Sequence, residues 1–464
     1  MNSHSLNSLF RLLVVSLAVS LGGCGTLTHT PYTPPETAAP TQWQHGNSQP
    51  AETDQWWTQF RDPELDALIS EVLLRNNDLT AAGLSVRRAW LEAGLAADAE
   101  SPELSANLSS TGEKDLRSSN KGTTQKHSAT LGVSYEVDLW GKLSSSRDAA
   151  EWEARATEQD RNNTAWTLVG TTARLYWKLA YLNQRLTLSQ ENVDYAQRTL
   201  KIAEVRHDAG AVSGLDVIEA EQSLASLQAT YSTVLQSLVE TRNAVAILLD
   251  SAPGRSLADP ARLPDTALPE IPAGIPAELL GRRPDLQAAE LRLRSTLASG
   301  DATRTSYYPS INLTGNLGSS STALSNLLNN PVGTLGVGLA LPFMQWNAMQ
   351  LSIKVAKIDY EKAVVNFRQT LYEAMADVEN ALSARTQYAH QHALLVRSLE
   401  LARESERRYE VRYRSGAVSL KSWLDAQKTR READLALAAT RYNQFDNLVT
   451  LYQALGGTVP LTDR

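Results

Sequence analysis

The residue best suited to covalent chemistry is Cys24, the only cysteine of the chain. It follows Leu21-Gly22-Gly23, at the end of a segment that contains Arg11 and an apolar run from Leu12 to Leu21. At about 10 residues, this run is too short to cross a bilayer core as a helix, so it is typical of an export signal. We predict a signal peptide over residues 1–23 and lipid attachment, including palmitate, at Cys24. The alternative is an ordinary signal peptide with a leftover free thiol.

Signals for other chemistry are weak. The seven histidines are scattered without the spacing of metal ligands, and neither Gly-x-Ser-x-Gly nor a phosphate-binding glycine loop occurs. The net charge of −7 argues against a nucleic-acid partner, which requires a basic face. We therefore predict no enzyme, no cofactor and no metal site, and we look for function in the architecture.

Two identical turns indicate that the chain is duplicated. Gly210-Ala211-Val212-Ser213, with Arg206 before it, recurs as Gly416-Ala417-Val418-Ser419, with Arg412 before it. Glycine tolerates the left-handed conformation that ends a helix, so both glycines are predicted helix C-caps. Other signals recur at almost the same offset, which favours two copies of one structural unit.

The duplication sets the predicted boundaries. We place the first repeat at residues 56–250 and the second at 278–457, with a proline-rich linker over 251–277 between them. A proline-rich tether over 24–55 precedes the first repeat, and a short tail over 458–464 ends the chain. Proline-rich segments of this kind are extended spacers.

Each repeat contains a pattern for two very long helices. Apolar residues alternate at spacings of four and three from Leu168 to Ala203, and again from Val217 to Leu248, which is the seam of a coiled coil. No proline lies between Lys142 and His207, so this helix is predicted to run for about 66 residues, or roughly 100 Å. The second repeat has the same layout from Ala348 to Arg414 and from Leu420 to Leu455. The pattern predicts antiparallel helical hairpins.

Shorter segments alternate apolar and polar residues, as strands do. They lie around Leu104–Leu108, Leu131–Val137, Ile311–Leu317 and Val337–Leu341. Their length suits transmembrane strands with one face toward lipid, although a soluble sandwich shows the same alternation. An open four-stranded sheet in hydrocarbon leaves backbone groups unpaired, so a barrel requires at least two chains.

Several longer motifs resemble one family: the outer membrane factors of tripartite efflux and secretion systems, the TolC-like proteins, and in particular their lipoprotein branch. The motifs are Trp56-Trp57 with Phe60-Arg61-Asp62-Pro63-Glu64-Leu65-Asp66-Ala67-Leu68, Tyr135-Glu136-Val137-Asp138-Leu139-Trp140-Gly141-Lys142, Arg282-Arg283-Pro284-Asp285-Leu286, Tyr308-Pro309-Ser310-Ile311 and Leu451-Tyr452-Gln453-Ala454-Leu455-Gly456-Gly457. They occur in the family's order over nearly the whole mature chain.

The resemblance implies an α+β membrane protein. Four strands from each chain of a homotrimer would form one 12-stranded transmembrane β-barrel, continued by a long periplasmic α-helical barrel, with the linker over 251–277 in an equatorial region. The implied partners are a periplasmic adaptor (membrane fusion protein) and an inner-membrane pump, of RND type rather than ABC type. The implied localisation is the outer membrane, with a lipid anchor.

The resemblance also implies roles for residues near the two turns. Arg206, Gly210, Ala211, Val212 and Ser213 would form one periplasmic tip that docks the adaptor, and Arg412, Gly416, Ala417, Val418 and Ser419 the other. A pure capping role is the alternative for both turns.

Carboxylates near the turns are implied to gate the pore. Asp425, with Asp216 and Glu219 of the first repeat, would form carboxylate rings that narrow the pore and favour cations. Solvated charges favoured by the helix dipole are the alternative. Ser422 stands where many relatives carry a second acid.

We therefore expect a passive exit channel for small molecules that a pump delivers. The alternative is a non-conducting outer-membrane scaffold or adhesin. A metal-efflux role finds little support in a chain with four methionines. The sequence does not identify the exported substrate.

Overall fold

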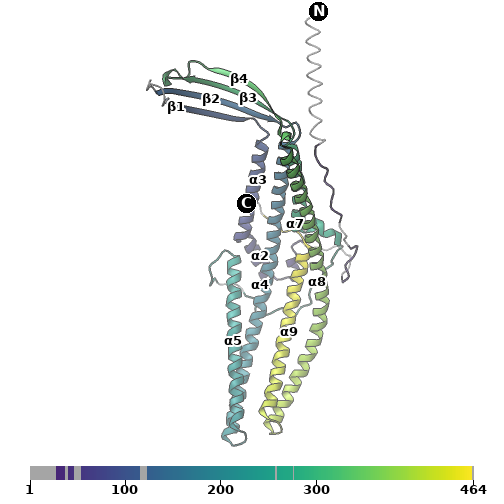
Figure 1. Cartoon of the computed structure of the whole chain (residues 1–464). Coiled ribbons are helices and arrows are strands. Elements are labelled where there is room, and N and C mark those ends of the chain that lie inside the picture. Colours follow the sequence, from purple (N-terminus) through teal and green to yellow (C-terminus); the bar gives the residue numbers. More distant parts are fainter. Residues whose placement is uncertain are drawn as a thin grey trace, which may run out of the picture. The chain divides into compact units, whose positions relative to one another are not determined.

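The computed structural model describes residues 28–36, 40–45, 54–114, 123–255, 259–274 and 276–461 (Figure 1). The predicted signal peptide, Cys24 and parts of the tether, the linker and the tail lie outside these residues. In chain order, the elements are η2 Trp56–Phe60, α2 Pro63–Arg75, α3 Asn77–Asp98, β1 Glu103–Lys114, β2 Thr123–Val137, α4 Lys142–Asp208, α5 Gly214–Leu248, η3 Pro276–Glu278, α6 Leu279–Arg282, α7 Pro284–Thr305, β3 Ser310–Ser321, η4 Leu324–Asn326, β4 Val332–Ala340, η5 Pro342–Met344, α8 Trp346–Arg414 and α9 Leu420–Leu455. None of the helices within the described ranges combines the length and the apolar character that crossing a bilayer requires.

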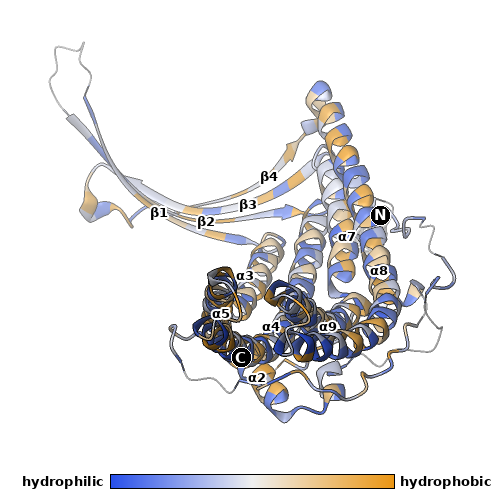
Figure 2. Ribbon diagram, turned by 90° about the horizontal axis from the view of Figure 1, so that it is seen from below, coloured by the Kyte–Doolittle hydropathy of each residue, from blue (hydrophilic) through white to orange (hydrophobic). Residues whose placement is uncertain are grey.

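The four strands form one antiparallel sheet in the order β1-β2-β3-β4. Their register places apolar residues opposite one another, as in the row Leu104, Val133, Gly315 and Leu335. The next row, on the other face, contains Ser105, Gly132, Asn316 and Thr334, so the predicted alternation of faces is present (Figure 2). The apolar face is open in the single chain, since the Leu335 side chain is 92% exposed.

The strands extend further than the alternating pattern predicts. β1 continues to Lys114, and β2 begins at Thr123. Threonine suits a strand because its branched side chain packs well on a pleated surface. Hydroxyls also pair across the strands, as with the Ser109 and Ser128 Oγ atoms at 2.7 Å.

The turn from β2 into α4 explains one of the family motifs. Asp138 caps the helix, because its carboxylate accepts hydrogen bonds from the backbone N–H groups of Leu143 and Ser144 at 3.0 and 2.9 Å. Gly141 supplies a positive φ of 73° at the corner. Trp140 packs edge-on against Tyr308 and donates its indole N–H to the Pro309 carbonyl at 2.8 Å. Trp140 therefore fixes this bend.

The chain divides into two compact units, which we describe separately. The first comprises Met1–Thr37, Leu84–Gln159 and Gln287–Gln369, and contains the sheet. Described residues of the predicted tether pack within this unit. The Thr30 backbone N–H and hydroxyl bind the buried Asp301 carboxylate of α7 at 2.7 and 2.6 Å, and the Arg294 guanidinium lies 4.6 Å from the Tyr32 ring centre. This part of the tether is held by specific contacts.

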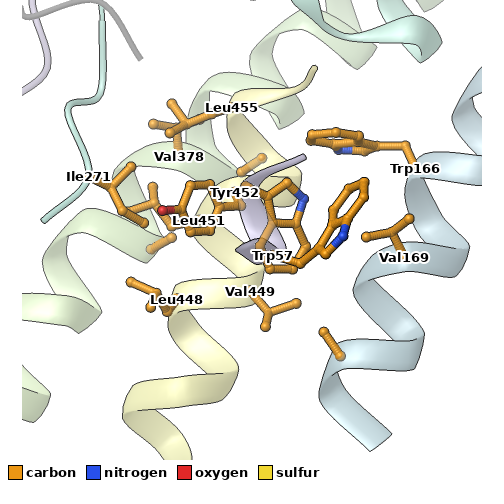
Figure 3. Close-up of a cluster of buried hydrophobic side chains, with 14 of the residues drawn as sticks. Trp57, Trp166, Val169, Ile271, Val378, Leu448, Val449, Leu451, Tyr452 and Leu455 are labelled. Carbon is orange, nitrogen blue, oxygen red and sulfur yellow. The ribbon is translucent and has the colours of Figure 1, made fainter. Parts of the chain in front are cut away.

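The second unit comprises Ala38–Gly83, Asp160–Leu286 and Thr370–Arg464. Its core joins two of the family motifs, since Trp56 stacks on Tyr452 with 4.8 Å between ring centres. Figure 3 shows Trp57 and Tyr452 in the same buried cluster. Phe445 packs against both Phe60 and Trp177. These large side chains are buried together, so the segment before α2 is fixed to α4 and α9 by hydrophobic contact.

The Arg282–Leu286 motif packs against the end of α9 in the same unit. Gly456 has a φ of 72°, and a Cβ built there would lie 2.7 Å from the Arg282 carbonyl oxygen. The Gly457 N–H donates to the same carbonyl at 3.0 Å. The neighbouring Arg283 guanidinium binds Asp285 at 2.7 Å and the Ala454 carbonyl at 3.3 Å. The paired glycines let the backbone approach this closely.

Candidate functional site: the hairpin ends and the groove between them

The two repeated turns have the same backbone hydrogen bonds. Ala211 N–H donates to the Arg206 carbonyl and Ala417 N–H to the Arg412 carbonyl, each at 2.8 Å. Gly210 and Gly416 have φ values of 71° and 79°. A bond across six residues next to a left-handed glycine is the Schellman ending of a helix. The predicted caps are therefore present. They explain why glycine occupies positions 210 and 416, and they satisfy the backbone carbonyls of Arg206 and Arg412.

The rest of each turn is free of this capping requirement. Ala211 and Ser213 of the first turn are exposed, as are Ala417 and Ser419 of the second, while Val212 and Val418 are half-buried. The Ser419 hydroxyl accepts from the Ser422 N–H at 3.4 Å, whereas Ser213 makes no such cap bond. Helix capping therefore does not explain why the same exposed side chains occur in both turns.

The two arginines that precede the turns differ in environment. Arg206 lies 4.7 Å from the centre of the Tyr413 ring and donates to the Tyr413 carbonyl, so it joins the first hairpin to the second. It also lies against the second turn, 3.8 Å from a Cβ built at Gly416. Arg412 is exposed on α8. The sequence treated the pair as equivalent, but Arg206 is engaged within the chain and Arg412 faces outward.

The three candidate gate carboxylates separate into two places. Glu219 of α5 and Asp425 of α9 line one groove, with a volume of about 530 Å³. Asp216 instead lies near Tyr413, whose pKa is raised by burial and by the Asp216 charge. Two of the predicted acids are therefore brought together, whereas the third belongs to the contact between the hairpin ends.

Asp425 also has a partner that the sequence analysis missed. The Lys421 ammonium lies 3.6 Å from the Asp425 carboxylate, one helical turn away. Lys428 pairs in the same way with Glu432 at 3.8 Å. The signal was present as charges of alternating sign at helical spacing, which place side chains on one face.

A buried polar network lies beside this groove. The Arg430 guanidinium binds the carboxylates of Glu406 on α8 and Asp434 on α9 at 2.6 and 2.7 Å, and Asn192 of α4 at 3.0 Å. Gln427, which is fully buried, donates to the Thr199 hydroxyl of α4 at 3.2 Å. The network therefore connects the second hairpin to the first.

Sequence reasoning missed this network because it followed apolar seam positions. Glu406 and Asp434 are both buried, although acidic residues are rarely buried unless they are paired. The i,i+4 spacing of Arg430 and Asp434 was the available signal. Arg431 is also desolvated, because burial first and the nearby Arg430 second lower its pKa.

Within the described part of the chain, no cluster of three or more His, Cys, Asp or Glu side chains is arranged to hold a metal ion. The arrangement of the described site is that of packed hairpin ends, a charged groove and exposed turns. Such a site can contact a protein and line a passage.

Comparisons with known proteins give a consistent result. The family model described as "Outer membrane efflux protein" matches residues 68–250 and 275–457, so the internal duplication is confirmed. The pyoverdine export outer membrane protein OpmQ of Pseudomonas putida is 31% identical over 460 residues, which are 96% of this chain and 97% of that protein. The probable efflux pump outer membrane protein TtgC of Pseudomonas putida is 31% identical over 469 residues, 96% of this chain and 95% of that protein.

Solved structures share the fold. The MtrE outer membrane channel of Neisseria gonorrhoeae, in its open state, matches with a TM-score of 0.78 and 28% identity, over 92% of this chain and 98% of that chain. The chain therefore resembles proteins of similar length and fold.

Proposed function

Because the chain belongs to the outer membrane efflux protein family and is an outer membrane channel of an efflux or export system, we propose that it works as a lipid-anchored homotrimer. The predicted family, the fold with four strands per chain and long helices in two repeats, the channel function and the non-enzymatic class are confirmed. The scaffold or adhesin alternative has no observation in its favour.

One observation supports a closed oligomer, and the family resemblance supplies the number three. The sheet has four strands, and its outer strands β1 and β4 each pair on one side only within the described chain. Unpaired strand edges are costly in hydrocarbon, where water cannot satisfy the backbone. Three copies supply twelve strands, which close a barrel in which β1 of one copy pairs with β4 of the next.

Exposed helix faces in the first unit support the same arrangement. Leu84, Leu91 and Leu95 form an exposed apolar stripe on α3, at helical spacing. A second stripe on α8 contains Leu351, Val355, Ile358 and Val365. Two different apolar stripes on one chain suit a head-to-tail ring, because each can be covered by the other stripe of a neighbouring copy.

Native mass spectrometry in detergent tests this proposal. The intact protein is expected at three times the chain mass. Leu91→Glu, which places a charge in the α3 stripe, is expected to shift the protein toward single chains. Ser85→Glu, which adds the same charge at an exposed position of α3 outside the stripe, is the matched control. A wild-type protein that stays monomeric in a native-like membrane would contradict the trimer.

The hairpin ends are proposed to dock a periplasmic adaptor. The exposed parts of both turns, with Arg412 beside the second, have no complete structural explanation within the described chain. Arg206 supports docking indirectly, because its contact with Tyr413 holds the two turns together. The family relationship implies a pump as the ultimate partner, and we propose the RND type from the resemblance to the lipoprotein branch.

Two further assignments complete the proposal. Cys24 carries the lipid anchor, which the Leu-Gly-Gly-Cys pattern supports. Asp425 and Glu219 narrow the periplasmic entrance, which their shared groove supports, and Asp216 acts with them through the contact near Tyr413. Radiolabelled palmitate incorporation in cells, lost in Cys24→Ser, tests the anchor.

A further inference from the structure

Helix α9 carries a stripe of charges that alternate in sign. Lys421, Asp425, Lys428 and Glu432 follow one another at spacings of four, three and four residues, which place them on one face of the helix. The Lys421–Asp425 and Lys428–Glu432 distances are 3.6 and 3.8 Å. All four residues line the groove between α5 and α9.

Stability does not account for this stripe. The side chains are 70% and 64% exposed in the first pair, and 68% and 65% exposed in the second. Ion pairs as exposed as these contribute little to folding, because water screens the charges and the long side chains lose freedom. We therefore look for the role of the alternating charges in how the groove interacts with solutes.

The charges of the groove lining balance. The cationic side chains are Lys421, Lys428 and Arg431, and the carboxylates are Glu219, Asp425 and Glu432. The other residues of the lining are uncharged, and include Gln222, Ser223 and Thr230 of α5. A groove with carboxylates alone would attract cations and repel anions, and this one has an equal number of opposite charges.

We propose that Lys421 and Lys428 determine the selectivity of the channel: they offset the carboxylates of the entrance, so that solutes of either charge pass. This inference rests on the proposed function, in which the groove between α5 and α9 faces the shared passage of the trimer. With three copies, each lysine position adds three positive charges beside the candidate gate acids. The exported molecules then include anionic and zwitterionic compounds as well as cations.

The test is the ion selectivity of single channels. Wild-type protein and the Lys421→Gln/Lys428→Gln variant are inserted into planar bilayers under a KCl gradient, and the reversal potential gives the ratio of K⁺ to Cl⁻ permeability. Glutamine keeps much of the side-chain length and removes the charge. The wild type is expected to discriminate weakly, and the variant to favour K⁺ by about tenfold more, which corresponds to about 1.4 kcal/mol.

Two controls make the test specific. The control for Lys421→Gln alone is Lys201→Gln. Lys201 is similarly exposed and pairs with Glu204 at 3.2 Å, but it does not line the groove. The permeability ratio of Lys201→Gln is expected to match that of the wild type. The reciprocal variant Asp425→Asn/Glu432→Gln is expected to shift selectivity toward Cl⁻.

The outcomes separate the two levels of the proposal. If the wild type forms channels but removal of both lysines leaves the reversal potential unchanged, the selectivity role is overturned and the channel stands. If the wild type is already strongly cation-selective, the charge balance is likewise refuted. If correctly assembled wild-type trimers carry no current, the proposed passage itself fails, and the selectivity role fails with it.

Discussion

Substitution of Arg430 by methionine should loosen α9 from α8 in the second hairpin and remove its hydrogen bond to Asn192 of the first. Arg430 bridges Glu406, Asp434 and Asn192, and both carboxylates are only 8% exposed in their side chains. Loss of one partner from a buried ion pair costs about 3–5 kcal/mol, because the other charge stays buried without compensation. Asp434 keeps Arg403 at 2.9 Å, so we expect a cost near the lower limit, about 3 kcal/mol.

Local opening of the hairpin end provides the assay. Chymotrypsin cleaves after aromatic residues, and Tyr413 and Trp423 are 1% exposed, so cleavage there requires the helices to separate. When opening is fast relative to cleavage, the cleavage rate follows the population of the open form. A cost of about 3 kcal/mol then predicts cleavage roughly 100-fold faster in Arg430→Met than in the wild type.

Arg407→Met is the matched control. Arg407 is 72% exposed and pairs with Glu404 along α8, and exposed pairs contribute only about 0–1 kcal/mol. We expect a cleavage rate within about fivefold of the wild type. Equal cleavage rates for the Arg430 and Arg407 variants would refute the view that the buried network holds the end of the second hairpin closed.

Three further predictions concern other parts of the second unit. Gly456→Ala should destabilise the protein by at least about 2 kcal/mol. Its φ of 72° and ψ of 176° lie in a region that is essentially restricted to glycine and costs other residues about 1–3 kcal/mol, and the new Cβ would lie 2.7 Å from the Arg282 carbonyl oxygen. Gly94→Ala, where the new Cβ would meet no atom within 4 Å outside the local helix backbone, should be neutral or stabilising, and equal urea midpoints for the two variants would contradict this. Asp446→Asn should raise the melting temperature at pH 7, because burial raises the Asp446 pKa against the opposing effect of Arg174. Since a raised pKa means that ionisation is disfavoured in the folded state, this gain should vanish below about pH 4, where the carboxyl is protonated in both states; a gain that does not depend on pH would refute the desolvation argument. Asp425→Ala should raise single-channel conductance, and an unchanged current would refute the gate assignment.

The regular elements could be predicted from the sequence because their patterns are long. The seam from Leu168 to Ala203 repeats often enough to identify a helix, and α9 begins at Leu420 and ends at Leu455 as predicted. The glycine caps were also predictable, since a left-handed residue is required at a helix end and glycine supplies it with little strain. Strand ends were less predictable, because Ser and Thr near Thr123 suit both loops and strands.

Contacts between distant segments were beyond such patterns. Arg206 and Arg412 occupy equivalent places in the two repeats, and only packing shows that Arg206 reaches Tyr413. The buried position of Asp434 likewise depends on Arg403 and Arg430 from two helices. The sequence located the candidate acids but did not show that Asp425 and Lys421 are paired, since side-chain geometry decides this.

Docking of the hairpin ends is the claim that links this channel to a pump, and site-specific photo-crosslinking at Ala417 tests it most directly. Ala417 is exposed in the second turn. The same crosslinker at Ser325, which is exposed in the segment between β3 and β4, serves as the control. Mass spectrometry of crosslinked products from living cells is expected to identify a periplasmic adaptor at Ala417 and not at Ser325. Intact trimers that capture no adaptor at Ala417, in cells that actively export, would contradict it.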